Sequence, residues 1–518
     1  MTITSGTLHE MNKDIFMQNL SEQQIIRRKK LKELKLLGLN PYPSDEYRIK
    51  IPIINIQENF TEKESIRIAG RLIRLRILGK ASFGEIKDHT GRIQIYFKKN
   101  HFDSEKIGKE ESYNILLKKL IDIGDIIGVQ GFLFKTKMNE ITVHVQKLTL
   151  LSKSLRPLPQ VKVDKNKKIY DAFSNPEQRY RMRYVDLIVN DHVKEIFLKR
   201  THIIRKIRNF LDDKGYLEVD TPILQSIPGG AVARPFVTYH NSLGIPLYLR
   251  IANELYLKRL IIGGFHGVYE FSKNFRNEGM DRLHNPEFTV LELYVAYKDY
   301  YWMMNFTEKL LKCIFHQMQK NFKDILIEND SISFQTPFPR IPILDAIQTH
   351  TGFDLREMEE EELRKICQKL HIEENSQMNK GKLIENIFEV KCEKHYKNPT
   401  FIIDYPIEMS PLTKRHRYKK NLSERFELIV NGQEIANAYS ELNDPIDQLD
   451  RLREQIKFSE KKESMFLDKD FIRALEFGMP PTAGIGIGID RLVMLFTKQN
   501  SIQEVLLFPQ MRPENKVK

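Results

Sequence analysis

The sequence predicts an α+β chain with a small β-barrel near its N-terminus and a larger domain of antiparallel strands and helices behind it. Residues 66–150 contain five short runs rich in β-branched and aromatic residues. A proline-rich joint follows, and strand-like and helix-like runs alternate from about residue 170 onward. The dipeptide Asn431-Gly432 separates two of these later runs, FELIV and QEIAN, and is a strong signal for an antiparallel hairpin.

Length and composition limit the possible classes of protein. The 518 residues are too many for one hydrophobic core, so two or three domains are expected. The chain carries 82 Lys and Arg against 69 Asp and Glu, and the resulting charge of +13 indicates a polyanionic partner, unless it serves only solubility. The three cysteines form no CxxC pair, so neither a structural zinc site nor a disulfide framework is predicted. No run approaches the roughly 18–20 apolar residues of a membrane span and no signal or transit peptide is recognisable, so we expect a cytoplasmic protein.

The first element in chain order is a basic helix over residues 21–37, SEQQIIRRKKLKELKLL. Ser21 is its expected N-cap, and Gly38 follows its last turn. Its basic side chains either contact phosphates or form a solvated face, and the sequence leaves both interpretations open. We predict an N-terminal extension (1–60), a barrel domain (61–155), a linker (156–180) and the larger domain (181–518).

The order of elements in the barrel domain predicts its topology. The strand-like runs are IRIAGRLIRLRILG, KASFGEI, GRIQIYF, DIIGVQGFLF and ITVHVQKLTLL, and a helical piece, EESYNILLKKLI, lies between the third and the fourth. Five strands with a helix before the fourth are typical of the OB-fold barrel. Such barrels bind oligonucleotides on one face, which agrees with the basic charge of the chain.

In the larger domain, the segment FTVLELY predicts a strand that begins at Phe288. Alternate side chains of a strand share a face, so Phe288, Glu292 and Tyr294 point one way. This face fits a ligand site, but it also fits the solvent side of an edge strand. The preceding run, GVYEFSKNF, ends just before Arg276, and an antiparallel pair of these strands places Arg276 near Glu292. Opposite charges on one face suit a zwitterionic ligand.

Near the C-terminus, AGIGIGIDRLVMLF alternates three glycines with three isoleucines. The isoleucines are expected to pack in the core, and the glycines leave the backbone bare for close approach of a flat ligand or another backbone. Arg491 falls in the first turn of the helix that follows. A helix N-terminus favours anions, so an arginine there makes sense if it meets an incoming anion. A surface arginine beside a glycine-rich strand is the alternative.

Together these segments resemble the class II lysyl-tRNA synthetases over nearly the whole chain. FRNEG, HNPEFT and the following E-x-Y match motif 2 of that class, and GIGIGIDRLVMLF matches motif 3. KGYLEVDTPIL matches motif 1, whose proline, here Pro222, lies at the dimer interface in the family. Other segments resemble the lysyl enzymes in particular. These segments are IPGGAVARPF, ELYLKR, PTFIIDYP, SPLTK, GKASF, GRIQ and RPLP.

The resemblance implies an OB-fold anticodon-binding domain followed by a class II catalytic domain with an antiparallel sheet flanked by helices. It implies a lysine–tRNA ligase, which converts L-lysine and ATP to lysyl-adenylate and pyrophosphate and then transfers lysine to the 3′ end of tRNA(Lys). Mg²⁺ is the implied cofactor, and a homodimer is the implied assembly. Both steps join bound partners, so positioning and charge stabilisation are expected to dominate catalysis.

The resemblance also implies roles for individual positions. The implied ATP-binding residues are Arg276, Glu278, His284, Asn285, Phe288, Glu434 and Arg491, with Arg276 and Arg491 as the catalytic pair. The implied lysine-binding residues are Gly230, Glu254, Arg276, Glu292, Tyr294, Asn437 and Glu441. Mg²⁺ is assigned to Glu434 and Glu441, and the anticodon to Phe83, Gln94 and Glu140. On pattern alone, Phe83 also fits the barrel core.

Two alternatives remain at this point. A lysyl ligase that modifies a protein would share the catalytic domain but lack the OB-fold domain, which this chain has. A non-enzymatic RNA-binding protein with a decayed catalytic domain is expected to lose Glu434, Glu441 or Arg491, and all three are present. The sequence therefore favours the tRNA ligase.

Overall fold

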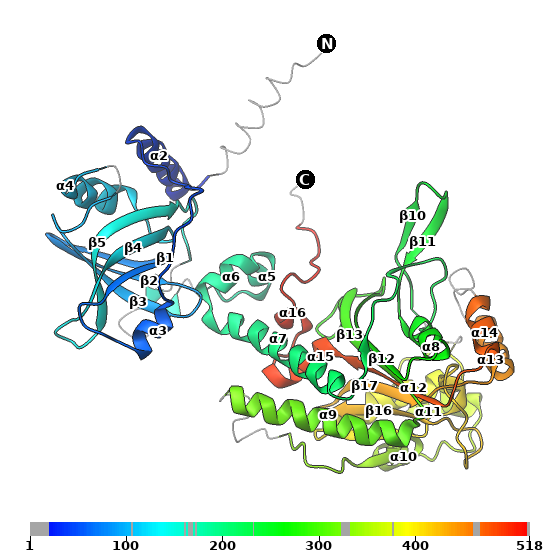
Figure 1. Cartoon of the computed structure of the whole chain (residues 1–518). Helices are drawn as coiled ribbons and strands as arrows, with labels where there is room; N and C mark the ends of the chain where they lie inside the picture. The colour runs from blue at the N-terminus through cyan, green and yellow to red at the C-terminus, as the bar shows by residue number, and fades with distance from the viewer. Residues whose placement is uncertain are drawn as a thin grey trace. The chain divides into compact units, whose positions relative to one another are not determined.

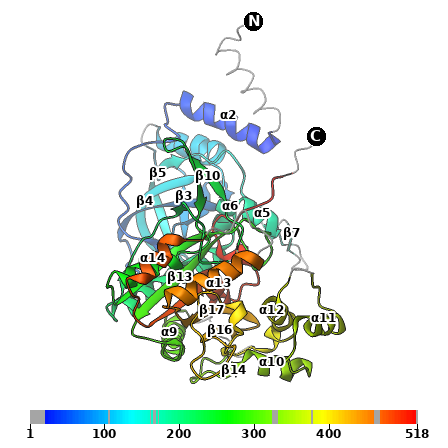
Figure 2. The same cartoon turned by 90° about the vertical axis from the view of Figure 1, so that its right-hand side faces the viewer.

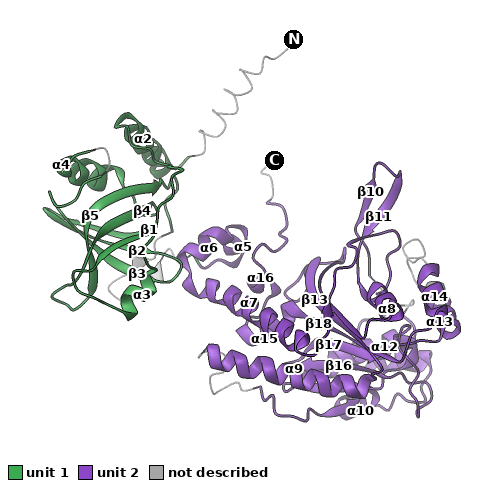
Figure 3. Cartoon of the chain, viewed as in Figure 1, with its two compact units in different colours: residues 1–173 green, residues 174–518 purple. Residues whose placement is uncertain are grey.

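The computed structural model describes residues 20–104, 107–159, 162–163, 169–170, 173–231, 233–322, 332–375, 378–458 and 467–514. The chain divides into two compact units, Met1–Phe173 and Ser174–Lys518, which are coloured separately in Figure 3. The division falls inside the predicted linker. Helix α5 (Pro176–Arg181) already belongs to the second unit, where Arg179 donates two hydrogen bonds of 2.8 Å to the carboxylate of Glu504.

The first unit is a closed five-stranded barrel with the strand order β1-β2-β3-β5-β4 (Figure 1). Its strands are β1 (Ser65–Leu78), β2 (Ala81–Lys87), β3 (Arg92–Lys98), β4 (Ile126–Lys135) and β5 (Ile141–Ser152). Helix α4 (Lys109–Glu111) and the π-helix η1 (Ser112–Leu120) come between β3 and β4. The predicted OB-fold order is confirmed. Smaller elements are α3 (Ile53–Glu58), β6 (Lys162–Val163) and β7 (Ile169–Tyr170).

The basic N-terminal helix is α2 (Glu22–Leu36), and Ser21 caps its first turn as predicted. Two of its basic side chains have a role that neither interpretation of the sequence included. Arg27 is buried and donates to the carbonyl of Ile123 at 2.8 Å, and Lys30 pairs with Asp122 at 2.6 Å. These contacts attach the helix to the barrel.

The second unit is built on an eight-stranded sheet with the order β14-β15-β16-β17-β18-β13-β12-β8. The strands are β8 (Leu217–Glu218), β12 (Gly267–Phe275), β13 (Glu287–Ala296), β14 (Arg340–Pro342), β15 (Thr400–Ile403), β16 (Arg425–Val430), β17 (Gln433–Ser440) and β18 (Thr482–Gly488). Only β14 and β8, at the two edges, run parallel to their neighbours. The predicted antiparallel sheet is confirmed, and β13 is an interior strand between β12 and β18.

Helices flank this sheet (Figures 1 and 2). They are α5, α6 (Arg183–Val189), α7 (Asp191–Asp212), α8 (Glu254–Ile262), α9 (Tyr300–Asn321), α10 (Ile343–Thr351), α11 (Glu360–Lys369), α12 (Lys380–Lys391), α13 (Pro445–Phe458), α14 (Lys469–Glu476), α15 (Ile489–Thr497) and α16 (Ile502–Val505), with the short 3₁₀ turns η2 (Glu393–His395) and η3 (Ile407–Met409). The main core lies between the sheet and α7, α9 and α15. Leu291, Leu293, Ile485 and Ile487 point into it, as their alternation predicts, so the opposite face of the sheet is left for a site.

Two smaller features complete the unit. A three-stranded sheet consists of β9 (Leu224–Gln225), β10 (Val237–His240) and β11 (Ile245–Leu249). The predicted hairpin β16–β17 is confirmed, and its turn residues Asn431 and Gly432 have φ of 52° and 68°, the left-handed values that its two-residue turn requires. None of the helices in the described part of the chain is long and apolar enough to cross a membrane.

Candidate active site

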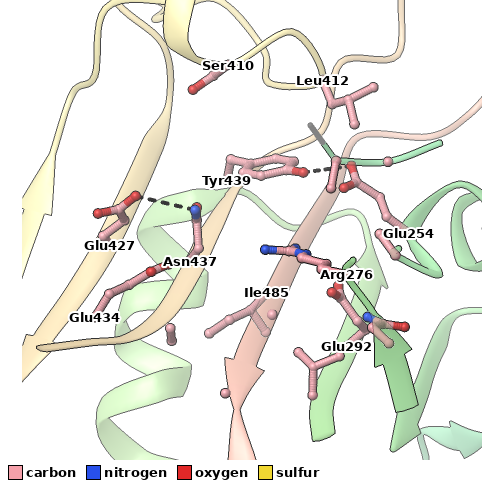
Figure 4. Close-up of a pocket in the computed structure, with 18 of the residues that line it drawn as sticks. Glu254, Arg276, Glu292, Ser410, Leu412, Glu427, Glu434, Asn437, Tyr439 and Ile485 are labelled. Carbon is pink, nitrogen blue, oxygen red and sulfur yellow. Dashed lines mark hydrogen bonds between the residues drawn. The ribbon is translucent and has the colours of Figure 1, made fainter. Parts of the chain in front are cut away.

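A cavity of about 750 Å³ opens on the face of the sheet opposite the main core (Figure 4). It brings together twelve of the thirteen residues that the sequence assigns to ATP or lysine. These are Gly230, Glu254, Arg276, Glu278, His284, Asn285, Phe288, Glu292, Tyr294, Glu434, Asn437 and Arg491. The thirteenth, Glu441, is buried directly behind the wall. Segments far apart in the sequence thus meet at one site.

The strand alternation that the sequence predicted for β13 holds in the structure. Phe288, Glu292 and Tyr294 face the cavity, and because β13 is an interior strand, this face is not the solvent side of an edge strand. On the neighbouring strand β18, a Cβ at Gly486 would lie 3.1 Å from Glu292 Oε1, and one at Gly484 would collide with Glu441 Oε1. These two glycines therefore make room for protein carboxylates as well as for a ligand.

The deep end of the cavity is acidic. Tyr439 donates a hydrogen bond of 2.6 Å to Glu254, and Tyr294 donates one of 2.9 Å to Glu292. Burial, with the nearby charge of Glu254 adding to it, raises the pKa of Glu292 to about 8. A carboxyl whose pKa is raised in this way is stabilised in its charged form by a nearby cation, so this end is suited to an ammonium group.

Glu441 belongs to this deep end too. Its Oε2 pairs with Lys258, which also donates to Glu254 Oε1 at 2.5 Å, while its Oε1 accepts no hydrogen bond from the residues that the structure describes. Burial raises the pKa of Glu441, and the charge of Glu254 raises it further, although Lys258 opposes both effects. Glu441 is therefore placed to accept a hydrogen bond from a buried donor.

Glu434 and Glu441, the predicted metal pair, lie at opposite ends of strand β17 and face different surroundings. Glu434 lies beside Glu427 of strand β16, and both line the cavity (Figure 4). Burial raises the pKa of Glu427 to about 8, and the charge of Glu434 contributes to that shift. Glu427 is not among the residues predicted from the sequence. The hairpin at Asn431-Gly432 could have indicated it, because Ile429 pairs with Glu434 and Glu427 comes two residues before Ile429 on the same strand.

These two carboxylates fit a magnesium ion that also binds a phosphate. No three His, Cys, Asp or Glu side chains of the described residues gather closely enough to hold a metal by themselves. Mg²⁺ is commonly bound by one or two carboxylates together with the phosphates of a substrate. Glu427 and Glu434 provide such a partial set on the cavity wall, where each also pairs with an arginine, Glu427 with Arg425 and Glu434 with Arg491.

The cavity wall also carries cations. Arg276 lies with its guanidinium carbon 5.1 Å from the ring centroid of Phe288. Arg491, in the first turn of α15 as predicted, donates to the backbone carbonyl of Glu434 at 2.9 Å and lies 3.4 Å from Nε2 of His284. The cavity therefore holds arginines as well as carboxylates, as a ligand pair of opposite charges requires.

A second group of predicted residues lies in the barrel. Phe83 is half-buried on the outer side of β2, while Ser82 and Ile86 point into the barrel, so Phe83 does not belong to the barrel core. Its ring centroid is 5.0 Å from that of Tyr96. Gln94 donates a hydrogen bond of 2.7 Å to Glu140. The outer face of the barrel thus combines aromatic rings with side chains that form hydrogen bonds, the combination that reads unpaired bases.

Comparisons with known proteins find matches to both units of the chain. The sequence model of the class II tRNA synthetases (D, K and N) matches residues 175–512, and that of the OB-fold nucleic acid binding domain matches residues 66–151. The chain is 59% identical over 502 residues to a lysine–tRNA ligase of Porphyromonas gingivalis, covering 96% of this chain and 86% of that protein. It is 58% identical over 500 residues to a lysine–tRNA ligase of Azobacteroides pseudotrichonymphae (96% and 99% covered) and 58% over 510 residues to one of Christiangramia forsetii (98% and 89% covered).

Proposed function

The chain belongs to the class II tRNA synthetases and, within them, to the lysine–tRNA ligases, and we propose from this premise that it activates L-lysine with ATP and transfers the lysyl group to the 3′ end of tRNA(Lys). The two steps are lysyl-adenylate formation with release of pyrophosphate, followed by transfer of lysine to the tRNA.

One observation carries the choice of lysine. The deep end of the cavity has three carboxylates, the buried Glu254 and Glu441 and the half-buried Glu292, and two tyrosine hydroxyls that bond to Glu254 and Glu292. A lysine side chain is an ammonium group on an apolar stem and needs a buried anion, because an unpaired charge in a pocket costs several kcal/mol. Aspartate and asparagine, which relatives in the same family handle, have no such cation.

For the rest of the lysine molecule we assign Arg276 to the carboxylate. Gly230 lies against Ala252 and Glu254, where a backbone with φ of 87° approaches the α-amino end without a side chain in the way. Asn437 accepts a hydrogen bond from Arg425 at 3.1 Å and lines the same cavity, so it also contacts lysine in our assignment.

ATP occupies the opposite end in this proposal. Arg276 and Arg491 are the catalytic pair: Arg276 stabilises the charge that develops at the α-phosphate as the lysine carboxylate attacks it, and Arg491 holds the adenine from the side opposite Phe288. Phe288 stacks on the adenine, Glu278 contacts it, and His284 with Asn285 faces the terminal phosphates. Mg²⁺, when bound by Glu427 and Glu434 together with ATP, neutralises phosphate charge.

The tRNA is bound through the barrel. We assign the anticodon bases to Phe83, Gln94 and Glu140, because stacking on an aromatic ring together with hydrogen bonds to base edges reads unpaired bases. The positive charge of the chain supports binding to the phosphate backbone. We place this reaction in the cytoplasm.

We further propose that two copies of the chain associate through motif 1. Large apolar side chains near Pro222 are exposed: Ile223 by 46%, Leu224 by 49% and Val237 by 64%. Exposed apolar side chains that lie together are typical of a protein–protein interface.

The test is pyrophosphate exchange. The protein is incubated with ATP, labelled pyrophosphate and each of the twenty amino acids in turn, and lysine is expected to give the dominant signal. Charging of tRNA(Lys) with labelled lysine tests the second step. If another amino acid supports faster exchange than lysine, the proposed function is wrong.

A further inference from the structure

One buried lysine lies behind the lysine pocket and has no part in the chemistry described so far. Lys258 is on helix α8, one turn after Glu254, and its side chain is fully buried. It is not one of the residues that line the cavity. An ammonium group buried this completely is costly unless it is paired, so its surroundings explain why it is tolerated.

The partners of Lys258 come from two separate parts of the chain. Its Nζ pairs with Glu254 Oε1 at 2.5 Å on its own helix and with Glu441 Oε2 just beyond strand β17. The rings of Tyr439 and Phe471 lie 5.5 and 6.0 Å from the same nitrogen. Lys258 thus fixes two carboxylates that approach the pocket from different elements.

The charges of this cluster match those of the proposed substrate. The carboxylates of Glu254, Glu292 and Glu441 would by themselves place three negative charges around one small volume. The positive charge of Lys258 reduces the formal charge of this cluster from three negative charges to two. A lysine molecule brings two positively charged ammonium groups. Without Lys258, Glu254 and Glu441 would repel each other and turn away or take up protons.

The position of Glu441 shows that this cluster is open on the cavity side. Its Oε1 has no hydrogen-bond donor among the described residues and lies where a side chain of Gly484 would be, beside the ring of Tyr294. Gly484 and Tyr294 both line the cavity. A buried carboxylate oxygen without a donor at a cavity wall indicates a donor that arrives with a ligand.

We propose that Lys258 is a positioning and specificity residue: it holds Glu254 and Glu441 in place and sets the charge of the pocket equal and opposite to that of the two ammonium groups of lysine. This inference rests on the proposed function, because lysine is the ligand that it concerns. Lys258 itself does not touch the substrate in this account.

The test uses Lys258→Met, which keeps the length of the side chain and removes its charge. Truncating one partner of a buried charge pair is costly, so we expect the KM for lysine in pyrophosphate exchange to rise about 30-fold or more. The KM for ATP is expected to stay within about threefold of the wild-type value, because the arginines of the cavity are unchanged. Parallel increases in both constants, or an unchanged lysine KM, would overturn the proposal.

A matched control is available in the barrel. Lys153 is also fully buried and also bridges two carboxylates, those of Asp122 and Asp125. Lys153→Met removes a charge of the same kind and is expected to leave the lysine KM within about threefold of wild type. An increase as large as that of Lys258→Met would mean that any buried lysine has this effect, and the proposal would fail.

A second variant keeps the test decisive if Lys258→Met does not fold. Lys258→Met combined with Glu441→Gln removes one charge of each sign, so the pocket keeps its net charge. We expect this double variant to fold and to bind lysine within about fivefold of Glu441→Gln alone, because the two residues act as a pair. Failure of the double variant to fold, or a further large rise in its lysine KM, contradicts the pairing. The proposed function fails separately, if wild-type protein shows no lysine-dependent exchange.

Discussion

Two buried lysines, one in each unit, make nearly the same contacts and have different consequences. In the barrel, Lys153 Nζ donates to Asp122 at 2.6 Å, to Asp125 at 2.8 Å and to the carbonyl of Leu120 at 2.7 Å. The other oxygen of Asp125 accepts from the backbone of Ser154 at 2.8 Å. Every group in this cluster has a partner within the protein, so the cluster contributes to stability and leaves nothing for a ligand.

In the catalytic unit, Lys258 bridges Glu254 and Glu441 in the same way, but the cluster is incomplete. Glu441 Oε1 has no donor among the described residues, and a cavity lies beside it. Burial and pairing of charges therefore do not by themselves identify a ligand site. The unsatisfied oxygen next to a cavity does, because a buried acceptor without a partner is rare in folded proteins.

The largest expected effect comes from the cavity carboxylate that faces the ligand. Glu292→Gln keeps the shape of the side chain and removes its charge, so kcat/KM for lysine in pyrophosphate exchange should fall at least about 10²-fold. The dissociation constant of ATP, measured by calorimetry, should stay near the wild-type value. Asp125→Asn is the matched barrel variant, and it should lower the unfolding temperature without changing lysine activation. Unchanged exchange in Glu292→Gln would refute the assignment of the ammonium end.

The barrel has a functional region as well, on its outer face. Phe83→Ala removes a proposed stacking partner of an anticodon base, so charging of tRNA(Lys) should fall about tenfold or more. Pyrophosphate exchange with lysine should remain unchanged, because it needs no tRNA. Ile86→Val, in the barrel core of the same strand, serves as control and should affect stability alone. Equal loss of exchange and charging in Phe83→Ala would instead indicate a structural role for Phe83.

The raised pKa of Glu292 predicts that lysine binding depends on pH. Its carboxyl keeps a proton up to about pH 8 in the empty folded site, against a usual value of 4.5, so the free protein binds this proton at pH 7. Lysine favours the ionised form, so its binding should release about one proton at pH 7 and should tighten about tenfold from pH 6 to pH 7. Calorimetry in buffers of different ionisation enthalpy measures the released proton. Glu292→Gln should release none, and proton release equal to wild type would mean that another group titrates.

The same shift affects stability with the opposite sign. Between pH 4.5 and about 8 the folded chain binds this proton and the unfolded chain does not. The contribution of Glu292 to the free energy of unfolding, measured without lysine, therefore decreases as pH rises through this window. Added lysine should offset this decrease.

The smallest effect is expected from a glycine that makes room for a carboxylate. A Cβ at Gly486 would lie 3.1 Å from Glu292 Oε1, so Gly486→Ala should push that carboxylate and raise the lysine KM by about fivefold. In the barrel, a Cβ at Gly91 meets its nearest neighbour at 3.6 Å, an ordinary contact. Gly91→Ala should leave both exchange and charging unchanged, and a larger lysine effect there than at Gly486 would contradict the packing argument.

The sequence was sufficient to predict the strands of the two units and most of the residues that line the cavity. Alternation along FTVLELY placed Phe288, Glu292 and Tyr294 on one face, because a strand has a fixed period of two. The hairpin at Asn431-Gly432 followed from the left-handed conformation that such turns need.

The sequence was not sufficient where contacts join distant segments. The metal pair predicted from the sequence is Glu434 and Glu441, but of these two only Glu434 lines the cavity, and Glu427 of the preceding strand lines it too. The role of Lys258 depends on where helix α8 meets the end of strand β17, which no local pattern contains. Arg27 likewise looked like a surface charge until its carbonyl partners in the barrel were known.

If the cavity carboxylates select the ammonium group of lysine, the protein must discriminate strongly between lysine and norleucine. Norleucine has the same apolar stem and no side-chain ammonium, so the measurement is kcat/KM for each of the two amino acids in pyrophosphate exchange with wild-type protein. A site built around a buried polar partner rejects an analogue that lacks it by about 10⁴-fold or more, and we expect that preference for lysine here. A preference below about 10²-fold, the range that an apolar stem in a simple hydrophobic pocket would give, would contradict the account.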